Sequence, residues 1–233
     1  AARGGRPFVG RDEKALTAWN GLLITGLAKA ARVFGEPRYA DRAQGIADFL
    51  RGHAWDGRRL SAVFKDGTVH QAGFLEDHAY LLEGLTGLLQ ARWRDGDLGF
   101  ARAVAEAMLA HFEDPDEGGF FMTSDDREDL IHRPKPGLDQ SVPSGNGTAS
   151  RALLTLGHLL GEPRFLEAAD RTLRLFMPEM KAHPGACVSL ILGLEEALNP
   201  PLVVTLRGGD EARRWRDLVA PDLRPDHQLF HIP

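Results

Sequence analysis

Hydrophobic residues along the chain follow two alternating patterns. Some runs are apolar nearly all round, and they lie at 22–27, 81–89 and 153–160. Each run is followed by a segment with apolar residues at helical spacing on one face only: Tyr39, Ala43, Ile46 and Leu50; Phe100, Val104, Met108 and Phe112; and Phe165, Ala169, Leu173 and Phe176. A helix that is apolar all round is buried, whereas a helix with one apolar stripe faces water. The pattern therefore predicts three pairs of helices, each with an inner and an outer member.

A short turn motif separates the two members of each pair. Gly35-Glu36-Pro37-Arg38-Tyr39 recurs as Gly161-Glu162-Pro163-Arg164-Phe165, and residues 96–100 form a weaker copy. Proline suits the first position of a helix, because its fixed φ is helical and its missing N–H is not needed there. The motif thus marks αα-hairpins that repeat every 61 to 65 residues or so. This period is longer than that of common helical solenoids, and the extra length in loops favours a toroid of hairpins.

Loops and a tail complete the predicted organisation. Loops are expected at 53–75 and 113–143, and a fourth inner helix at 186–198. Beyond Pro200-Pro201, the pattern predicts a strand at 202–206, a helix at 211–219 and a strand at 228–232. We therefore expect an all-α fold in residues 1–199, a toroid of about three and a half hairpins, and a small βαβ appendage in residues 200–233. So few hairpins do not close a ring, so further hairpins or another chain should cover the open edges.

Composition narrows the class of protein. The chain has 233 residues, 43% of them hydrophobic, and a net charge of −5, which argues against binding to nucleic acid. No apolar run reaches the roughly 20 residues that span a bilayer. The single cysteine, Cys187, excludes an internal disulfide and a C-x-x-C motif. We expect a cytoplasmic protein without a cofactor, a bound metal, a membrane segment or a nucleic-acid partner.

Polar residues cluster where the inner helices should begin, so in a toroid they converge at one mouth. The candidate catalytic residues among them are Asp12, Glu76, Asp77, His78 and Asp139. Glycoside hydrolysis needs two carboxylates that flank the scissile bond. Epimerisation beside a carbonyl could instead use the imidazoles of His78 and His132. Glu76 and Asp77 are consecutive and therefore point about 100° apart on a helix, so only one of them should face the lumen.

The candidate substrate-binding residues lie in the same clusters or in the long loop. Trp19 could stack on a sugar ring, Arg133 could hold an anionic group, and polar partners for hydroxyl groups are Asn20, Ser144, Asn146 and His132. Each residue also has a purely structural interpretation. Asp, Ser and Asn at helix starts are ordinary N-caps. Trp19 could pack inside the barrel, His78 could be a hydrogen-bonded core residue, and the loop charges could be solvated.

Four motifs carry a resemblance to a known family. They are residues 12–22 (DEKALTAWNGL), residues 73–79 (GFLEDHA), residues 118–121 (GGFF) with the following Thr123, and residues 143–146 (PSGN). In order and spacing they are similar to the YyaL and spermatogenesis-associated protein 20 family of thioredoxin-domain-containing proteins. The chain departs from the family pattern at Glu13, His78 and Gly147, where the family usually has Asp, Tyr and Ser. The change at His78 weakens any catalytic role for that position.

The resemblance implies an architecture more firmly than a reaction. It implies an N-terminal thioredoxin-like domain followed by a six-hairpin (α/α) toroid similar to glycosidases and N-acylglucosamine 2-epimerases. The chain would then be the C-terminal half, without that domain and the first hairpins. One hypothesis is a pocket that binds or processes a sugar-like small molecule. The alternative is a non-catalytic interaction scaffold attached to the thioredoxin-like domain, in which Ala at Asp77 would change nothing.

Overall fold

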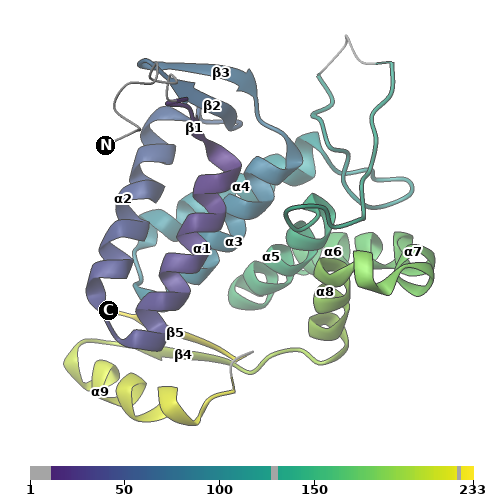
Figure 1. The fold of residues 1–233 in the computed structure, drawn as a ribbon. Helices are drawn as coiled ribbons and strands as arrows, with labels where there is room; N and C mark the ends of the chain where they lie inside the picture. Colours follow the sequence, from purple (N-terminus) through teal and green to yellow (C-terminus); the bar gives the residue numbers. More distant parts are fainter. Residues whose placement is uncertain (1–11, 127–130, 225–226) are drawn as a thin grey trace, which may run out of the picture.

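The computed structural model describes residues 12–126, 131–224 and 227–233. Helices α1 (Thr17–Phe34), α3 (Leu75–Ala91), α5 (Gly145–Leu160) and α8 (Val188–Leu198) pack side by side in that order. Their hairpin partners α2 (Pro37–His53), α4 (Asp95–His111) and α6 (Pro163–Leu175) lie on the outer side of this row, and α7 (Met177–Ala182) precedes α8 (Figure 1). The structure thus confirms the αα-hairpin toroid, with inner and outer helices in alternation and the ring incomplete.

Glycine and proline set the tight turns of the first and third hairpins. Gly35 ends α1 and Gly161 ends α5, both in the left-handed region with φ of 65° and 66°. Such a residue lets the chain leave a helix at no steric cost. Pro37 and Pro163 then start the outer helices. The middle turn differs from its expected place, because residues 92–94 connect α3 to α4 and Gly96 lies inside α4.

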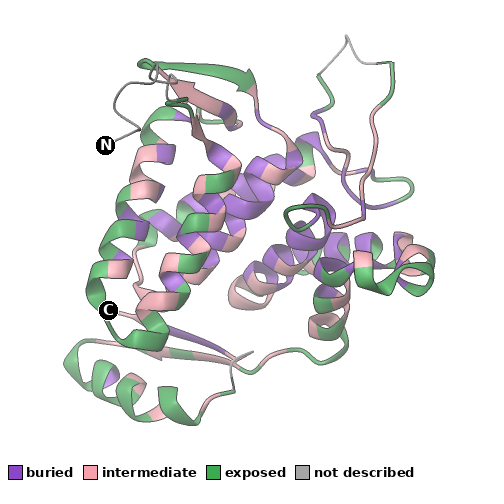
Figure 2. Ribbon diagram, in the orientation of Figure 1, coloured by how far each residue is buried: buried purple, intermediate pink, exposed green. Residues whose placement is uncertain are grey.

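The outer helices bury the predicted stripes, with one informative exception. In α4 and α6 the stripe residues are all buried, from Phe100 to Phe112 and from Phe165 to Phe176. In α2 the buried face includes Ala40, Ala43, Ala47 and Leu50, whereas Tyr39 and Ile46 of the predicted stripe are only half-buried. Ile46 lines an open hollow between α1 and α2. The amphipathic pattern therefore marks a surface that this part of the chain leaves open, and Figure 2 shows the mixed burial along α1 and α2.

Glycines let neighbouring inner helices approach closely. A Cβ atom built on Gly21 of α1 would lie 2.7 Å from the backbone nitrogen of Leu81 in α3. A Cβ on Gly84 of α3 would lie 2.9 Å from the carbonyl oxygen of Gly21, so the two glycines face each other. Farther along the row, a Cβ on Gly147 of α5 would lie 2.8 Å from the backbone nitrogen of Leu190 in α8. The same device thus holds α1 against α3 and α5 against α8.

A small antiparallel sheet occupies part of the region expected to be a loop. Its strand order is β1 (Ala15–Leu16), β2 (Ser61–Lys65) and β3 (Thr68–Ala72). The β2–β3 hairpin turns at Asp66 and Gly67, which both have positive φ. The Asp-Gly pair is a common turn signal, but the two strands were not predicted, because β3 is almost entirely exposed and lacks an apolar alternation.

The tail forms the expected βαβ unit and packs on the toroid. Strands β4 (Val203–Arg207) and β5 (Gln228–Ile232) pair in parallel, with α9 (Asp210–Val219) between them. Phe230 is fully buried and meets the Trp93 ring edge-on at a centroid distance of 6.0 Å. The Gln228 side chain donates to Thr155 Oγ1 of α5 at 3.3 Å. The tail therefore covers the carboxyl ends of α3 and α5, and its division from residues 1–199 as a separate domain stays a prediction.

The two ends of the helix row expose apolar side chains. Trp19 and Leu23 of α1 are 65% and 49% exposed, and Val188 and Leu192 of α8 are similarly open. In a closed ring these helices would have neighbours on both sides, so the exposed residues mark the two open edges. Across the described ranges, no helix is both long enough and apolar enough to cross a membrane.

Candidate functional site

The amino ends of the inner helices and the long connections gather at one end of the toroid. The segments that lead into α1, α3, α5 and α8 all lie there, whereas the short hairpin turns lie at the opposite end (Figure 1). The sequence clusters around Trp19, Asp77 and Asn146 are therefore brought to one side of the molecule, as the toroid requires. The individual contacts decide which of these residues are available to a ligand.

Asp77 is committed to holding two helices. Its side chain is 3% exposed, and its carboxylate accepts hydrogen bonds from two backbone amides. One bond comes from Phe74 N–H at the start of α3 and the other from Ala18 N–H in the first turn of α1, both at 2.8 Å. Burial raises the pKa of Asp77 to about 6, against the lowering effect of the two amides. We call such a carboxylate, which caps two adjacent inner helices, a bridging cap.

Asp139 is a second bridging cap. It accepts hydrogen bonds from Ser144 N–H at 2.8 Å and Ser189 N–H at 2.9 Å, which lie at the starts of α5 and α8. The Ser189 hydroxyl also donates to it. Ser144 is the N-cap of α5, and its hydroxyl accepts from Gly147 N–H at 3.0 Å. The capping interpretation therefore accounts for the contacts of Asp139 and Ser144.

Glu76 is the carboxylate of the clusters that remains free. It lies beside Asp77 but points to the other side, as their 100° offset on a helix predicts. A Cβ atom built on Gly145 would lie 3.2 Å from the Glu76 carboxyl carbon, so the glycine at the start of α5 makes room for this group. Burial raises the pKa of Glu76, and no other described side chain is hydrogen-bonded to it. Burial therefore favours the protonated form of this half-buried acid.

Two further polar residues follow Glu76 along the same face of α3. Tyr80 donates a hydrogen bond from its hydroxyl to the carbonyl of Pro143, which ties α3 to the segment before α5. Glu83 pairs with Arg151 of α5 at 2.7 Å, and burial raises the pKa of Glu83 although the charges of Arg151 and Lys29 lower it. The sequence analysis did not single out Tyr80 and Glu83, although their spacing from Glu76, four and then three further residues, is the pattern of one helix face.

His78 is a core residue, which corrects its assignment as a possible acid or base. No part of it is exposed. Its Nδ1 lies 2.8 Å from the carbonyl oxygen of Phe74, and its Nε2 accepts from Leu60 N–H at 3.2 Å. Burial lowers the pKa of His78 to about 4, so the ring is neutral with its proton on Nδ1. With both nitrogens bonded to backbone, His78 joins α3 to the chain before β2 and cannot reach a substrate.

Asn146 and Arg133 hold the long loop and are likewise engaged. The Asn146 amide accepts from Phe120 N–H at 2.7 Å and donates to the carbonyls of Phe120 and Pro136 at 2.9 and 3.0 Å. Arg133 donates to the carbonyls of Thr123 and His111, and its guanidinium lies 4.2 Å from the centre of the Phe121 ring. His132 is exposed on the loop surface. Asn146 and Arg133 therefore have structural roles in the loop, and their substrate roles stay predictions.

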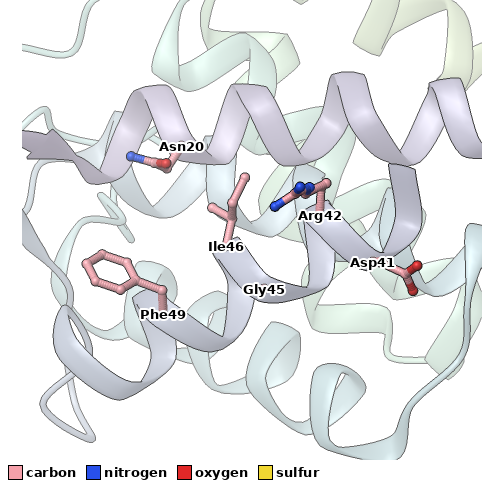
Figure 3. A pocket seen from close by; sticks show the side chains of 6 residues that line it. All are labelled: Asn20, Asp41, Arg42, Gly45, Ile46 and Phe49. Carbon is pink, nitrogen blue, oxygen red and sulfur yellow. The ribbon is translucent and has the colours of Figure 1, made fainter. Parts of the chain in front are cut away.

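The α1 candidates lie near the mouth but outside any deep cavity. Asp12 is exposed and pairs with Lys14 at 3.2 Å, and the hydrogen bond from Lys14 lowers its pKa. Trp19 projects into solvent from the first turn of α1. Asn20 lies in a hollow of about 480 Å³ between α1 and α2, on the open flank (Figure 3). These three residues are therefore accessible, and their environment depends on what adjoins α1.

A second hollow lies between the starts of α5 and α8. It has a volume of about 270 Å³ and is lined by residues 139–143 together with Arg151, Val188, Ser189 and Leu192. Both hollows are open, as expected where part of a ring is bounded on one side only. In the described ranges no three His, Cys, Asp or Glu side chains are grouped so that they could bind a metal ion.

Comparisons with known proteins agree with this architecture. No family model matches the chain. Spermatogenesis-associated protein 20 of Rattus norvegicus is 30% identical over 229 residues, which cover 94% of this chain and 29% of that protein. An uncharacterized protein, B0495.5, of Caenorhabditis elegans is 29% identical over 83% of this chain and 27% of its own length. The chain thus spans less than a third of the length of the curated relatives it matches.

Solved structures show the same six-hairpin fold. Cellobiose 2-epimerase from Spirochaeta thermophila matches with a TM-score of 0.58 and 18% identity, over 70% of this chain and 43% of that one. The GH76 α-mannanase BT2949 from Bacteroides thetaiotaomicron matches at 0.60 and 14%, over 73% and 46%. An inactive GH76A α-1,6-mannanase from Salegentibacter, in which two consecutive aspartates are replaced by asparagine, matches at 0.56 and 12%, over 75% and 49%. In each case the chain corresponds to about half of a complete toroid.

Proposed function

Since the chain is a relative of spermatogenesis-associated protein 20 and folds as part of a six-hairpin toroid, we propose that the face its inner helices present at their amino ends binds and processes a carbohydrate. The observation that carries the proposal is Glu76, a half-buried carboxylate with a raised pKa at that end. Several six-hairpin neighbours are named as sugar epimerases or glycoside hydrolases. A fold alone does not assign an activity, so the proposal depends on this residue.

Glu76 has the properties of a proton-transfer group, and its neighbours fix its position. Asp77 is immobilised by two backbone amides, so the turn of α3 that carries Glu76 cannot shift. A raised pKa brings a carboxyl group closer to titrating at neutral pH, and a general acid or base is most effective when its pKa lies near the working pH. Consecutive acidic residues also occur in the GH76A mannanase, which is described as inactive when both are amidated. In this chain Glu76 would transfer the proton and Asp77 would position it.

Trp19 is the proposed sugar platform. Ala18 N–H bonds directly to Asp77, so the first turns of α1 and α3 lie at the same level and Trp19 is on the turn facing that of Glu76. Its ring is 65% exposed and thus free to stack on the apolar face of a sugar. Arg151, held by Glu83, lies deeper on α5 and adds a cation to the same face. A ligand with hydroxyl groups and one apolar ring face would suit this surface.

The experiment is a thermal-shift and turnover screen of the full-length protein against mono- and disaccharides, amino sugars and sugar phosphates. A ligand that binds only the native state raises the melting temperature. Products identify the reaction, because a new reducing end marks hydrolysis and an altered configuration at C2 marks epimerisation. Glu76→Gln should abolish turnover with little loss of binding, whereas Trp19→Ala should weaken binding itself.

The matched control is Glu167→Gln, which amidates an exposed acid on the outer helix α6. It should leave both readouts unchanged. If Glu76→Gln turned over substrate as fast as Glu167→Gln, the assignment of Glu76 would be wrong. If no saccharide stabilised the protein, the carbohydrate proposal would fail, and a non-catalytic scaffold that binds protein partners would take its place.

A further inference from the structure

Helices α1 and α5 occupy equivalent positions in the internal repeat, and their corresponding residues make corresponding contacts. Asn20-Gly21 in α1 and Asn146-Gly147 in α5 stand at the same register ahead of the helix-ending Gly35 and Gly161. Each glycine admits the backbone of the next inner helix, α3 for Gly21 and α8 for Gly147. Two residues before each asparagine, a backbone amide donates to a bridging cap. The environment of one asparagine is therefore a guide to the environment of the other.

In α5 this asparagine clamps a passing backbone. The Asn146 amide both accepts from and donates to the main chain of Phe120, at 2.7 and 2.9 Å, in the way that a neighbouring strand would. Its third bond reaches the carbonyl of Pro136 at 3.0 Å. The clamped residue comes from the connection that leads into α5, and Phe120 precedes Asn146 by 26 residues. Asn146 thereby anchors a long connection to the start of its own inner helix.

In α1 the equivalent asparagine, Asn20, makes a hydrogen bond through its amide nitrogen alone within the described residues. Asn20 donates one bond, to the carbonyl of Leu16 at 2.8 Å, and no described residue donates to its Oδ1. It borders the 480 Å³ hollow between α1 and α2, whose other lining residues are Asp41, Arg42, Gly45, Ile46 and Phe49. Figure 3 shows Ile46 projecting from α2 toward α1, with Arg42 beside it. The hollow is thus a groove with an apolar floor and an amide at its rim.

We infer that Asn20 and this groove clamp an extended segment of the same polypeptide that lies N-terminal to this chain. The repeat supplies the occupant, because the partner of Asn146 comes from the connection that leads into its helix. Only 19 residues precede Asn20 here, fewer than the 26 between Phe120 and Asn146. The curated relatives are more than three times as long as the matched part, so they have the length to supply such a segment. The inference is independent of the carbohydrate proposal and removes Asn20 from the sugar site.

The test is hydrogen exchange, read by mass spectrometry, on the full-length protein. Asn146→Ala is the internal standard, and it should accelerate exchange at residues 118–121, because the Phe120 amide loses its acceptor. Asn20→Ala should accelerate exchange on the order of tenfold in one stretch N-terminal to this chain and leave residues 118–121 unchanged. Gly45→Leu should act like Asn20→Ala by filling the groove. A Cβ on Gly45 meets nothing within 4 Å and leucine favours helices, so this variant should fold normally.

The inference is overturned if Asn146→Ala releases residues 118–121 while neither α1 variant changes exchange N-terminal to this chain. It is also overturned if the released stretch is protected only at high protein concentration, because a second copy would then occupy the groove. Loss of saccharide stabilisation in Asn20→Ala, with upstream exchange unchanged, would instead make Asn20 a ligand contact. Loss of upstream protection with saccharide binding intact supports the clamp.

Discussion

The contact between α1 and α3 allows a matched pair of substitutions on one helix. Gly21 and Gly26 both lie inside α1 with ordinary helical φ. A Cβ on Gly26 meets nothing within 4 Å, whereas a Cβ on Gly21 would lie 2.7 Å from both Leu81 N and the Tyr80 carbonyl carbon. Gly26→Ala should therefore stabilise the protein by about 0.5–1 kcal/mol, the ordinary gain of alanine over glycine in a helix.

Gly21→Ala gains the same propensity but cannot keep the packing. The contact atoms belong to the backbone of α3, which cannot rotate away, so the helices must separate by about 0.7 Å to restore an ordinary contact of roughly 3.4 Å. Overpacking of this kind costs roughly 1–3 kcal/mol, and the separation also loosens the Ile24 contact with Gly84. We expect Gly21→Ala to be net destabilising and to lie about 1–3 kcal/mol below Gly26→Ala, because the propensity gain is common to both variants.

Urea unfolding of both variants, followed by circular dichroism, measures this difference. Equal m-values would show that the compactness of the two states is unchanged, so that the midpoints report stability alone. Equal midpoints for Gly21→Ala and Gly26→Ala would refute the reasoning, because the close backbone approach would then have no energetic consequence. Gly84→Ala should repeat the loss from the other side of the contact, since its Cβ would meet Gly21 O at 2.9 Å.

Three further predictions follow from single contacts. The pKa of His78 is about 4 in the folded protein and about 6.5 in the unfolded chain, so between these pH values only the unfolded state binds the proton. The free energy of unfolding of the native protein relative to His78→Gln should therefore fall by about 3 kcal/mol as the pH drops from 6.5 to 4. A difference that stays constant with pH in chemical denaturation would contradict this prediction. Phe230→Ala removes a fully buried ring from β5 and should cost about 3–5 kcal/mol in one cooperative transition, whereas a separate early transition in calorimetry would show that the tail unfolds alone. Gly145→Ala places a methyl group 3.2 Å from the Glu76 carboxyl carbon, so it should reduce the turnover of an identified substrate. The circular dichroism spectrum should stay native-like. Undiminished turnover would show that Glu76 does not need this space.

The hairpin architecture could be predicted from the sequence because it depends on repeated local signals. Gly35 and Gly161 end helices, and Pro37 and Pro163 start them. The apolar stripes of α4 and α6 recur at the spacing of helices with one buried face. These signals act within one or two turns, so a single sequence shows them. The β2–β3 hairpin was missed because its strands are mostly exposed and carry no alternation that marks a buried face.

The candidate site could be predicted only as a region. Asp77, Asp139, His78 and Asn146 were chosen for their chemistry, but each is bonded to backbone atoms that lie between 3 and 59 residues away. Sequence spacing does not show which polar group will receive such partners and which will stay free. Glu76 stayed free because its neighbour Asp77 faces the amides, and that division depends on where α1 packs.

The bridging caps also determine the order in which this part of the toroid can mature. Helix α1 has no side-chain cap of its own at Leu16, and its first turn is closed by Asp77, 59 residues farther along the chain from Ala18. During synthesis α1 therefore leaves the ribosome with its first turn uncapped, and the turn becomes fixed only when the start of α3 follows. The helix α5 differs, because Asp139 precedes it and is already present when Ser144 emerges. The first hairpin should thus become resistant to proteolysis on a translating chain only after residue 77 has emerged, although its own helices α1 and α2 are complete before then.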